Sequence, residues 1–284
     1  MIEAPSRRDR VRAATTSEIK QTARRLLVQQ GSEAVSLRAI ARAMGMTAPA
    51  LYRYFDSHEE LLRHVVADIF TELADELHEK IDAASDAARR ADAARRANGA
   101  GRANGAGRAD AAGRADAAGW ADAAGWADAA GLDLMTVKLI AACRAFRGWA
   151  LGHQPEFSMI FGSPLPGLEL AQDDPVMECG LRFCQVFLDL FHELWLCRPF
   201  DVPGPDEIDP SLRRQLERHR EQTGSDLPIG ALQTFLRCWV VLYGAVCLEV
   251  FGHLRFALDD PSPMFELMLC DLTPRLGLTY PQPR

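Results

Sequence analysis

The stretch SLRAIARAMGMTAPALYRYF, from Ser36 to Phe55, decides the fold of the N-terminal part of the chain. Its first half places apolar residues at the i, i+3, i+4 and i+7 spacing of one buried helix face: Leu37, Ile40, Ala41 and Met44. Ser36 stands where an N-cap residue belongs, and Gly45 stands where a helix must stop and reverse. This half therefore predicts a short helix that ends in a tight turn.

A second short helix follows that turn. Thr47 can cap it, and Pro49 suits its first turn, where a missing N–H costs nothing. Leu51 and Phe55 fall on its buried side, and Arg53 falls on its outer side. Two helices joined in this way form a helix-turn-helix, and the second one has the shape that enters a DNA major groove.

The longer segment from about Arg12 to Leu62 resembles the DNA-binding domain of the TetR family of bacterial transcription regulators. The residues that carry the resemblance are Gly31, Ser36 to Ala41, Gly45 to Thr47, Leu51, Tyr52, Tyr54, Phe55 and Glu59 to Leu62. Tyr54 stands where the family often has a histidine, and His58 stands where it often has a lysine that binds phosphate. The resemblance implies a three-helix DNA-binding domain with double-stranded operator DNA as its partner.

The residues expected to contact DNA lie on the second helix of the motif or close to it. They are Ser36, Arg38, Thr47, Ala48, Pro49, Tyr52, Arg53, Tyr54 and His58. The N-terminal end of such a helix meets base edges, where a hydroxyl can donate and small apolar groups can touch thymine methyls. Arg53 is long enough for guanine or phosphate, and the tyrosines suit phosphate. The alternatives are that Tyr52 packs as a half-buried aromatic residue and that Arg38 is a plain solvated charge.

Charge is unevenly distributed along the chain. The 284 residues have a net charge of −7, yet residues 1–56 hold ten Lys or Arg and five Asp or Glu, a local charge of +5. The rest therefore carries −12, and a basic end on an acidic body is typical of a protein that docks one end on phosphates. Residues 1–16 read as a basic arm that reaches a minor groove or phosphates, or else as a solvated disordered tail. Its arginines are Arg7, Arg8, Arg10 and Arg12.

Composition points to a cytoplasmic protein. With 48% hydrophobic residues the chain can form a sizeable core, and it contains no run of eighteen apolar residues, so no membrane partner is expected. The N-terminus lacks the apolar stretch of a secretory signal. The seven cysteines form no C-x-x-C pair and are expected to be buried, reduced thiols. The alternative is a redox-sensing pair formed by Cys179 and Cys184.

Five segments are expected along the chain. They are a basic flexible arm (1–16), a helix-turn-helix domain (17–56) whose first helix covers Ser17 to Gln30, a linking helix (57–95), an insertion (96–131), and a helical regulatory and dimerisation domain (132–278). Ser57 and Glu60 form a capping box for the linking helix, which can run well past residue 80 because no Gly or Pro interrupts it up to residue 98.

The insertion consists of six hexapeptides, with RANGAG, RADAAG and WADAAG each present twice. A glycine in every repeat disfavours a stable helix, and the side chains offer little to bury. The segment is therefore expected to be flexible or intermittently helical. The alternative is a role for its tryptophans as a ligand clamp or a tether for a partner.

From Leu134 onward the pattern is helical again and no convincing strand appears, so the expected fold class is all-α. A second resemblance, over about residues 134–275, is to a C-terminal regulatory domain found in many TetR-type proteins. It rests on the spacing of Trp239, Tyr243, Gly244, Leu248, Glu249, Gly252 and His253. In such proteins the last two long helices, here 228–254 and 261–276, pair with their twofold mates, which implies a homodimer.

The regulatory half has an aromatic lining that suggests a pocket between helices. The candidate ligand-binding residues are Phe146, Trp149, His153, Phe157, Phe161, Phe187, Phe191, Trp195, Trp239 and Tyr243. Candidate polar anchors are His153, His192, Tyr243 and Glu249. Such walls suit a small apolar or amphipathic effector. The alternative for each of these residues is a plain helical core.

The sequence contains no motif of an enzyme, a metal site or a nucleotide cofactor, so no catalytic residue, metal or cofactor is expected. The function expected is a dimeric repressor that a small ligand releases from its operator. One alternative is a DNA-binding regulator that answers to a protein partner or to no ligand. Another is a small-molecule-binding protein or enzyme that retains a vestigial DNA-binding head.

Overall fold

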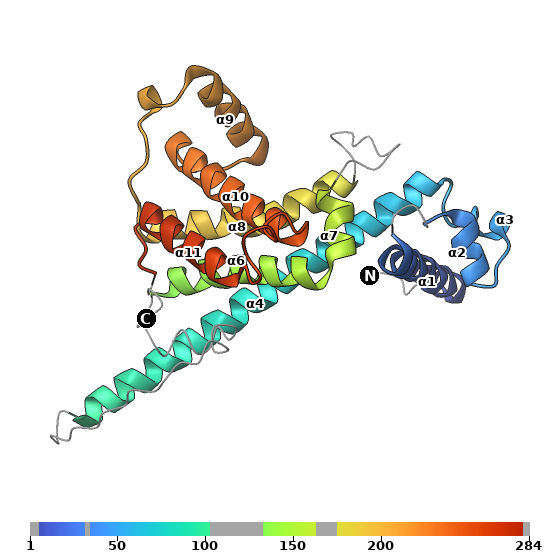
Figure 1. The fold of residues 1–284 in the computed structure, drawn as a ribbon, viewed down its shortest axis with the longest axis horizontal. Coiled ribbons are helices and arrows are strands. Elements are labelled where there is room, and N and C mark those ends of the chain that lie inside the picture. Colours follow the sequence, from blue (N-terminus) through green and yellow to red (C-terminus); the bar gives the residue numbers. More distant parts are fainter. Residues whose placement is uncertain (1–5, 32–34, 103–132, 163–174, 281–284) are drawn as a thin grey trace. The chain divides into compact units, whose positions relative to one another are not determined.

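The computed structural model describes residues 6–31, 35–102, 133–162 and 175–280, which contain helices and turns and no strand (Figure 1). The expected all-α class is thereby confirmed. The chain divides into two compact units. The first comprises Met1–Asp75 and Trp149–Cys184, and the second comprises Glu76–Gly148 and Gln185–Arg284.

Three helices of the first unit form the expected helix-turn-helix domain: α1 (Arg7–Gln30), α2 (Leu37–Ala43) and α3 (Ala48–Leu51). Their shared core contains Ile19, Ile40, Leu51 and Phe55, each at most 1% exposed. Gly45 has a φ of 66°, a left-handed conformation that glycine adopts without strain, and it turns the chain between α2 and α3. The sequence pattern therefore placed the turn and both buried faces correctly.

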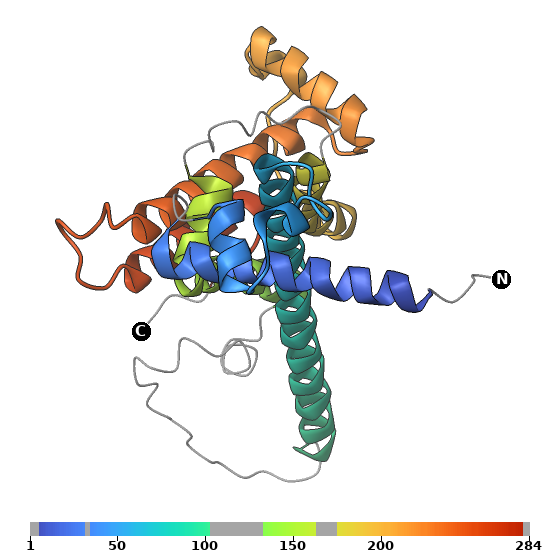
Figure 2. The same cartoon turned by 90° about the vertical axis from the view of Figure 1, so that its right-hand side faces the viewer.

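The first helix differs from the expectation, because α1 begins at Arg7 and not at Ser17. Ser6 caps it: the Ser6 hydroxyl accepts from the Asp9 N–H at 3.2 Å, and the Asp9 carboxylate accepts from the Ser6 N–H. This capping box stabilises a helix end whose side chains, up to residue 14, are all exposed. The arginines expected on a flexible arm therefore lie on a helix. The beginning of this helix is the part nearest the label N in Figure 2.

Helix α4 (His58–Arg102) begins where expected and is longer than expected. Ser57 caps it, with its hydroxyl accepting from the Glu60 N–H at 3.0 Å, whereas the Glu60 carboxylate accepts from the Asp56 N–H. An apolar stripe along the helix is buried: Leu61, Leu62, Val65, Ile69, Leu73 and Leu77. The helix continues beyond the boundary expected at residue 95 and into the hexapeptide repeats. The rest of the insertion lies outside the described residues.

The second unit contains most of the remaining helices. The C-terminal half of the chain forms α6 (Leu134–Gly152), α7 (Gln154–Phe161), α8 (Pro175–Cys197), η3 (Pro205–Glu207), α9 (Pro210–Thr223), α10 (Ile229–Val250), α11 (Ser262–Leu272) and η4 (Thr273–Leu276). Of these, α7 belongs to the first unit, and α6 and α8 have residues in both. Three rings form the centre of the second unit, because Phe146, Phe187 and Trp239 lie with their centroids 5.5 to 6.2 Å apart.

Two arginines of α6 hold the last helices in place. The Arg147 guanidinium donates to both carboxylate oxygens of Glu249 on α10, at 2.5 and 2.7 Å, and to the Ser262 hydroxyl at 2.8 Å. Arg144 donates in the same way to Glu266 on α11, at 2.8 and 3.0 Å, and to the Tyr280 hydroxyl. These paired contacts fix α10 and α11 against α6.

Helix α10 is long and apolar enough to cross a membrane, and 39% of its apolar window is buried in the fold. A core helix of a folded protein passes the same test of length and apolarity, so the expected absence of a membrane partner stays a prediction.

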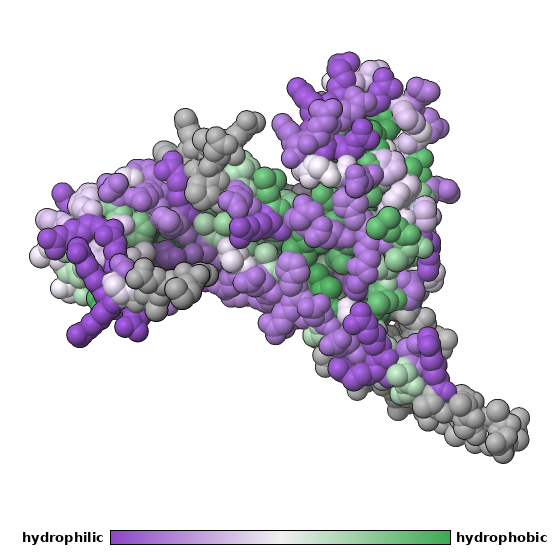
Figure 3. Space-filling model, turned by 180° about the vertical axis from the view of Figure 1, so that it is seen from behind, coloured by the Kyte–Doolittle hydropathy of each residue, from purple (hydrophilic) through white to green (hydrophobic). Residues whose placement is uncertain are grey.

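Much of the apolar surface of α10 that is not buried in the fold is exposed, as is that of α11. Val240 is 67%, Leu267 53% and Met264 49% exposed. Figure 3 shows the outside of α9, at the top right, as mainly hydrophilic, with hydrophobic residues gathered on the body below it.

Candidate DNA-reading surface and effector cavity

Helix α3, the candidate DNA-reading helix, exposes its N-terminal end. Thr47 is the N-cap residue, as expected, but its side chain makes no capping hydrogen bond, and Pro49 lies in the first turn. The expectation that the Thr47 hydroxyl caps the helix was therefore wrong. Thr47 and Pro49 are exposed and Ala48 is half-buried. The Thr47 hydroxyl is therefore available both to accept from and to donate to a ligand outside the domain.

The other end of α3 carries the longer side chains. Tyr52 is 53% exposed, which argues against its alternative role as a packing residue, and Arg53 is also exposed. The carbonyl oxygen of Arg53 accepts a hydrogen bond from the Arg12 guanidinium at 3.1 Å. The same guanidinium lies 5.8 Å from the centre of the Tyr54 ring. Helix α1 thus contacts the end of the reading helix through one arginine.

Three further candidates flank the motif. The Ser36 hydroxyl accepts from the Ala39 N–H at 3.2 Å, and its own proton remains available to donate. Arg38 is exposed and is the second residue of α2. The His58 ring nitrogen Nε2 lies 2.5 Å from the Val35 carbonyl oxygen, so it is engaged by the backbone before α2. His58 therefore braces the domain, and its ring nitrogen is not directed to a phosphate.

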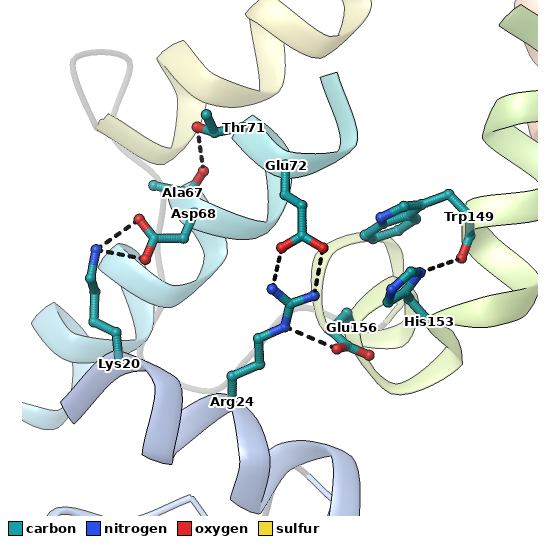
Figure 4. Close-up of polar contacts among 9 residues, drawn as sticks. All are labelled: Lys20, Arg24, Ala67, Asp68, Thr71, Glu72, Trp149, His153 and Glu156. Atoms are coloured by element: carbon teal, nitrogen blue, oxygen red, sulfur yellow. Dashed lines mark hydrogen bonds and ion pairs between the residues drawn. The ribbon is translucent and has the colours of Figure 1, made fainter. Parts of the chain in front are cut away.

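A polar network ties α1 to α4 and α7 (Figure 4). The Arg24 guanidinium donates to both carboxylate oxygens of Glu72 on α4, and its Nε donates to Glu156 on α7 at 3.0 Å. Glu156 is 4% exposed. One helical turn earlier, the Lys20 ammonium pairs with Asp68 at 2.6 Å. The sequence pattern gave no sign of this network, because its residues come from helices distant in the chain.

The charges of this network stabilise each other. The Arg24 guanidinium lowers the pKa of Glu72, and His153 contributes in the same direction, against the effect of burial. The two carboxylates in turn raise the pKa of Arg24. Because Glu156 is buried, removing Arg24 would leave a carboxylate without its described cationic partner. Such uncompensated buried charges are strongly destabilising.

The second unit contains an apolar cavity of about 50 Å³. Its wall comes from α6, α8, α10, α11, η4 and the segment that follows. The lining residues are Leu139, Ile140, Cys143, Phe187, Phe191, Phe235, Cys238, Trp239, Leu242, Leu269, Leu272, Thr273, Leu276 and Leu278. Thr273 is the one residue among them with a hydroxyl group. The wall therefore favours an apolar guest.

Three of the ten expected ligand-binding residues, Phe187, Phe191 and Trp239, line this cavity. Three others pack behind the wall or beside it. Phe146 contacts Phe187, Tyr243 stacks on Trp239 with ring centres 5.8 Å apart, and Trp195 packs edge-on against Phe200.

The other four expected ligand-binding residues belong to the first unit: Trp149, His153, Phe157 and Phe161. Trp149 stacks on His153 at 5.0 Å, and Phe161 packs against Phe70 on α4 at 5.6 Å. They pack around α7 and do not line this cavity. Trp149 and Phe157 are buried and His153 and Phe161 are half-buried, but apolar spacing alone could not show in which core they pack.

The expected polar anchors are also absent from the described wall. Glu249 pairs with Arg147, and the His192 ring lies 3.2 Å from the Ser225 hydroxyl. All seven cysteines are free, as expected, but the expected burial was wrong for most of them, since only Cys238 is fully buried and Cys197 is exposed. Cys143 and Cys238 line the cavity, and burial raises their pKa values to about 12 and about 11. Both therefore stay protonated and act as small apolar wall residues at neutral pH.

Two parts of the chain match models of known protein families. Residues 19–65 match a family model described as "Bacterial regulatory proteins, tetR family". Residues 139–272 match one described as "Tetracyclin repressor-like, C-terminal domain". The first match covers the helix-turn-helix, and the second covers α10 together with most of the cavity wall.

Similar proteins extend over nearly the whole chain. Two mycobacterial proteins, "HTH-type transcriptional regulator Rv1816" from Mycobacterium tuberculosis and "HTH-type transcriptional regulator Mb1846" from Mycobacterium bovis, are each 28% identical over 262 residues, which is 92% of this chain and 91% of each relative. The solved structure of "putative regulatory protein SCO4313" is 26% identical, has a TM-score of 0.61 and covers 95% of this chain and 98% of its own. A protein with unknown function from Rhodococcus sp. RHA1 shares the fold at 15% identity, with a TM-score of 0.55 over 93% of this chain and 95% of its own.

Proposed function

The chain belongs to the TetR family of bacterial transcription regulators, and we propose that it is a dimeric repressor released from its operator by a small apolar or amphipathic ligand. Members of this family bind DNA and regulate transcription, and they are not enzymes. The observation that carries the proposal is the exposed helix α3. The hydroxyl of its N-cap residue, Thr47, makes no capping hydrogen bond. A cytoplasmic location, where operator DNA is found, is part of the proposal.

The proposed contacts divide by their position on the motif. Thr47, Ala48 and Pro49 lie at the end of α3 that meets base edges, so they would contribute to the choice of sequence. A second set would contact phosphates and fix the register of the protein on the duplex: Ser36, Arg38, Tyr52, Arg53 and Tyr54. His58 is assigned to bracing the domain, since the Val35 carbonyl already engages its ring.

The exposed face of α10 and α11 is the proposed surface for a second copy of the chain. Its apolar residues border a groove of about 360 Å³, on which Gly244 and Ala245 allow a close approach. A Cβ atom added to Gly244 would meet nothing within 4 Å in one protomer. A larger groove of about 1150 Å³ continues this surface toward α9. Burying such a face against its twofold mate is the expected basis of a stable dimer.

The cavity is the proposed effector site, and its small size has a consequence for regulation. An apolar cavity of about 150 Å³ binds one benzene molecule in another protein, whereas this one measures about 50 Å³. An apolar ligand of benzene size or larger would therefore displace residues of the wall helices on entering it. Binding and helix displacement are then one event, which is what a ligand-controlled switch requires.

Helix α6 offers a route from the cavity to the DNA-binding domain. It contributes Leu139, Ile140 and Cys143 to the wall and leads directly into α7, whose Glu156 bonds Arg24 of α1. A ligand that shifts α6 would pull on α7 and, through that bond, on α1. The shift needs to change the relative stability of the two states by only a few kcal/mol to release DNA.

The test of DNA reading is selection of duplexes from a random pool by the purified protein, followed by footprinting. A protected site with two half-sites, spaced by one helical turn or a multiple of it, is the expected result. The binding must survive competitor DNA, which removes non-specific contacts. Folded protein that protects no site on any duplex would contradict the proposal and leave a vestigial DNA-binding head as the better explanation.

The test of ligand control is a thermal-shift screen of apolar and amphipathic metabolites. A true effector should raise the melting temperature and also lower the affinity for the selected duplex. A stabilising compound without an effect on DNA binding would point instead to control by a partner protein or to none. A reporter gene behind the selected site distinguishes repression from activation.

A further inference from the structure

Helix α3 is too short to be stable by itself. Helix α3 comprises four residues, Ala48–Leu51, and three residues in turn conformation follow before Phe55. A helix of this length has no turn with a full set of internal hydrogen bonds, so its geometry depends on contacts with its surroundings. Leu51 and Phe55 anchor its buried side. At the outer end the Tyr54 N–H donates to the Leu51 carbonyl at 2.9 Å, and the Arg53 carbonyl takes its partner from outside α3.

Arg12 of α1 supplies contacts at that end. Its Nη2 donates to the carbonyl oxygen of Arg53 at 3.1 Å, across 41 residues of sequence. Carbonyl groups at the C-terminal end of a helix lack partners within the helix, and a cationic donor there is favourable. The rest of the guanidinium lies 5.8 Å from the centre of the Tyr54 ring, within the range of a cation–π contact.

Arg12 is itself held by a well-anchored helix. Ile19, two turns further along α1, is fully buried in the core of the domain, and Lys20 pairs with Asp68 on α4. Position 12 is therefore fixed relative to the core, and Arg12 adds a tertiary contact to the backbone hydrogen bonds that already close the end of α3. Arg8 lies on the same exposed stretch, and among the described residues it makes no hydrogen bond, ion pair or cation–π contact with α3.

We propose that Arg12 is a positioning residue for DNA reading. Its guanidinium fixes the outer end of α3 and the Tyr54 ring, so that the side chains of this end meet the duplex in one orientation. Its effect is on the arrangement of the reading surface and not on the number of phosphates neutralised. The inference rests on the proposed role of α3 as the reading helix.

Salt dependence distinguishes this role from a phosphate contact. We expect Arg12→Gln to lower the affinity for the selected duplex about tenfold at every salt concentration, with little change in affinity for random duplex. The slope of log affinity against log salt should stay the same, because a lost phosphate contact would reduce it by about 0.9. Arg8→Gln, the matched control, should leave the ratio of specific to non-specific affinity unchanged. If Arg12→Gln loses about 0.9 in slope and keeps that ratio, Arg12 is an ordinary phosphate contact and the inference is wrong.

Two further variants probe the contact itself. Arg12→Lys keeps the charge but loses the planar guanidinium, so it should bind specific DNA more weakly than the wild type with the same salt slope. Wild-type affinity for Arg12→Lys would contradict the inference. Tyr54→Leu removes the ring, and Arg12→Gln should then cost less in that background than in the wild type. In Tyr54→Phe, which keeps the ring, it should cost as much as in the wild type.

One more variant distinguishes a failure of the Arg12 inference from a failure of the assignment of α3 as the helix that reads DNA. Thr47→Ala removes a proposed base contact without touching Arg12. If Thr47→Ala weakens specific binding and Arg12→Gln does not, the positioning role fails and α3 remains the reading helix. If neither variant changes specific binding, the assignment of α3 fails and takes the positioning role with it. Thermal unfolding of each variant checks that the domain remains folded.

Discussion

The proposed DNA-reading surface takes its candidate contacts from one short stretch between Ser36 and Tyr54, whereas the proposed effector cavity takes its wall from α6, α8, α10, α11 and η4. The first is a row of exposed side chains on a local motif. The second exists only when helices from distant parts of the sequence pack together. A substitution on the reading surface should therefore change DNA binding alone. A substitution around the cavity should change stability, assembly and DNA binding together.

The largest effect is expected where the second unit depends on a buried ion pair. Arg147→Ala removes the partner of Glu249, whose side chain is 8% exposed, and also the contacts with Ser262 and the Phe265 ring. We expect the free energy of unfolding in urea to fall by about 3–5 kcal/mol. Arg182→Ala is the matched control, since its pair with Glu178 is two-thirds exposed on both sides, and it should cost at most about 0.5 kcal/mol. Similar losses for both variants would contradict this account of the second unit.

The next effect concerns assembly. Gly244→Leu places a side chain on the proposed dimer surface, where an added Cβ meets nothing in one protomer. We expect the dimer dissociation constant to rise at least about 100-fold, equivalent to ~2.7 kcal/mol, with the helix content unchanged. Operator binding should weaken with it, although no reading residue has changed. Sedimentation measures the dissociation constant.

Gly148→Leu is the control for Gly244→Leu. Gly148 is also a helical glycine with open space around its added Cβ, but it lies on α6 and not on the proposed dimer surface. It should leave the dissociation constant unchanged. A Gly244→Leu protein that remains dimeric would show that the second copy binds elsewhere.

Arg53→Ala tests the proposed DNA-reading surface. The side chain is exposed at the end of α3, so its removal should lower operator affinity by about 1–2 kcal/mol and leave the melting temperature unchanged. Titration of the selected duplex measures the first quantity, and thermal unfolding measures the second. A drop in melting temperature as large as that of a core variant would mean that the reading surface is not separable from the fold.

The same contrast explains how far the sequence could predict the structure. The helix-turn-helix was predictable because a cap, a left-handed glycine and two apolar faces all lie within the stretch Ser36 to Phe55, and each has a local physical cause. The start of α1 was missed although its signal was also local. The capping box of Ser6 and Asp9 was present in the sequence, but the arginines around it favoured the interpretation of a flexible arm.

The cavity was only partly predictable. Apolar spacing identified buried rings correctly, but a buried ring on α7 and one on α8 have the same pattern although they pack in different units. Phe157 and Phe161 were therefore assigned to the pocket, and Phe235 and Leu242 were left out of it. Ion pairs such as that of Arg24 with Glu156 join residues 132 positions apart, and no pattern in a single sequence indicates them.

The smallest effect expected is a pH dependence at Glu72. The Arg24 guanidinium lowers the pKa of Glu72 in the folded state, so this pair stabilises the fold above the usual glutamate pKa of about 4.3. The contribution is lost as the pH falls through the lowered value, where Glu72 becomes protonated. Because the Glu72 side chain is 42% exposed, solvent screening keeps the contribution small.

Glu72→Gln isolates this contribution. At pH 7 the variant should be slightly less stable than the wild type in urea, and the difference should shrink as the pH is lowered below about 4.3. Glu178→Gln, in the exposed pair with Arg182, is the control and should show no such trend. A difference for Glu72→Gln that stays constant over the whole pH range would mean that its cause is the shape of the side chain and not the charge of Glu72. In that case Arg24 would be held chiefly by Glu156, and the link between α1 and α7 would outweigh the link between α1 and α4.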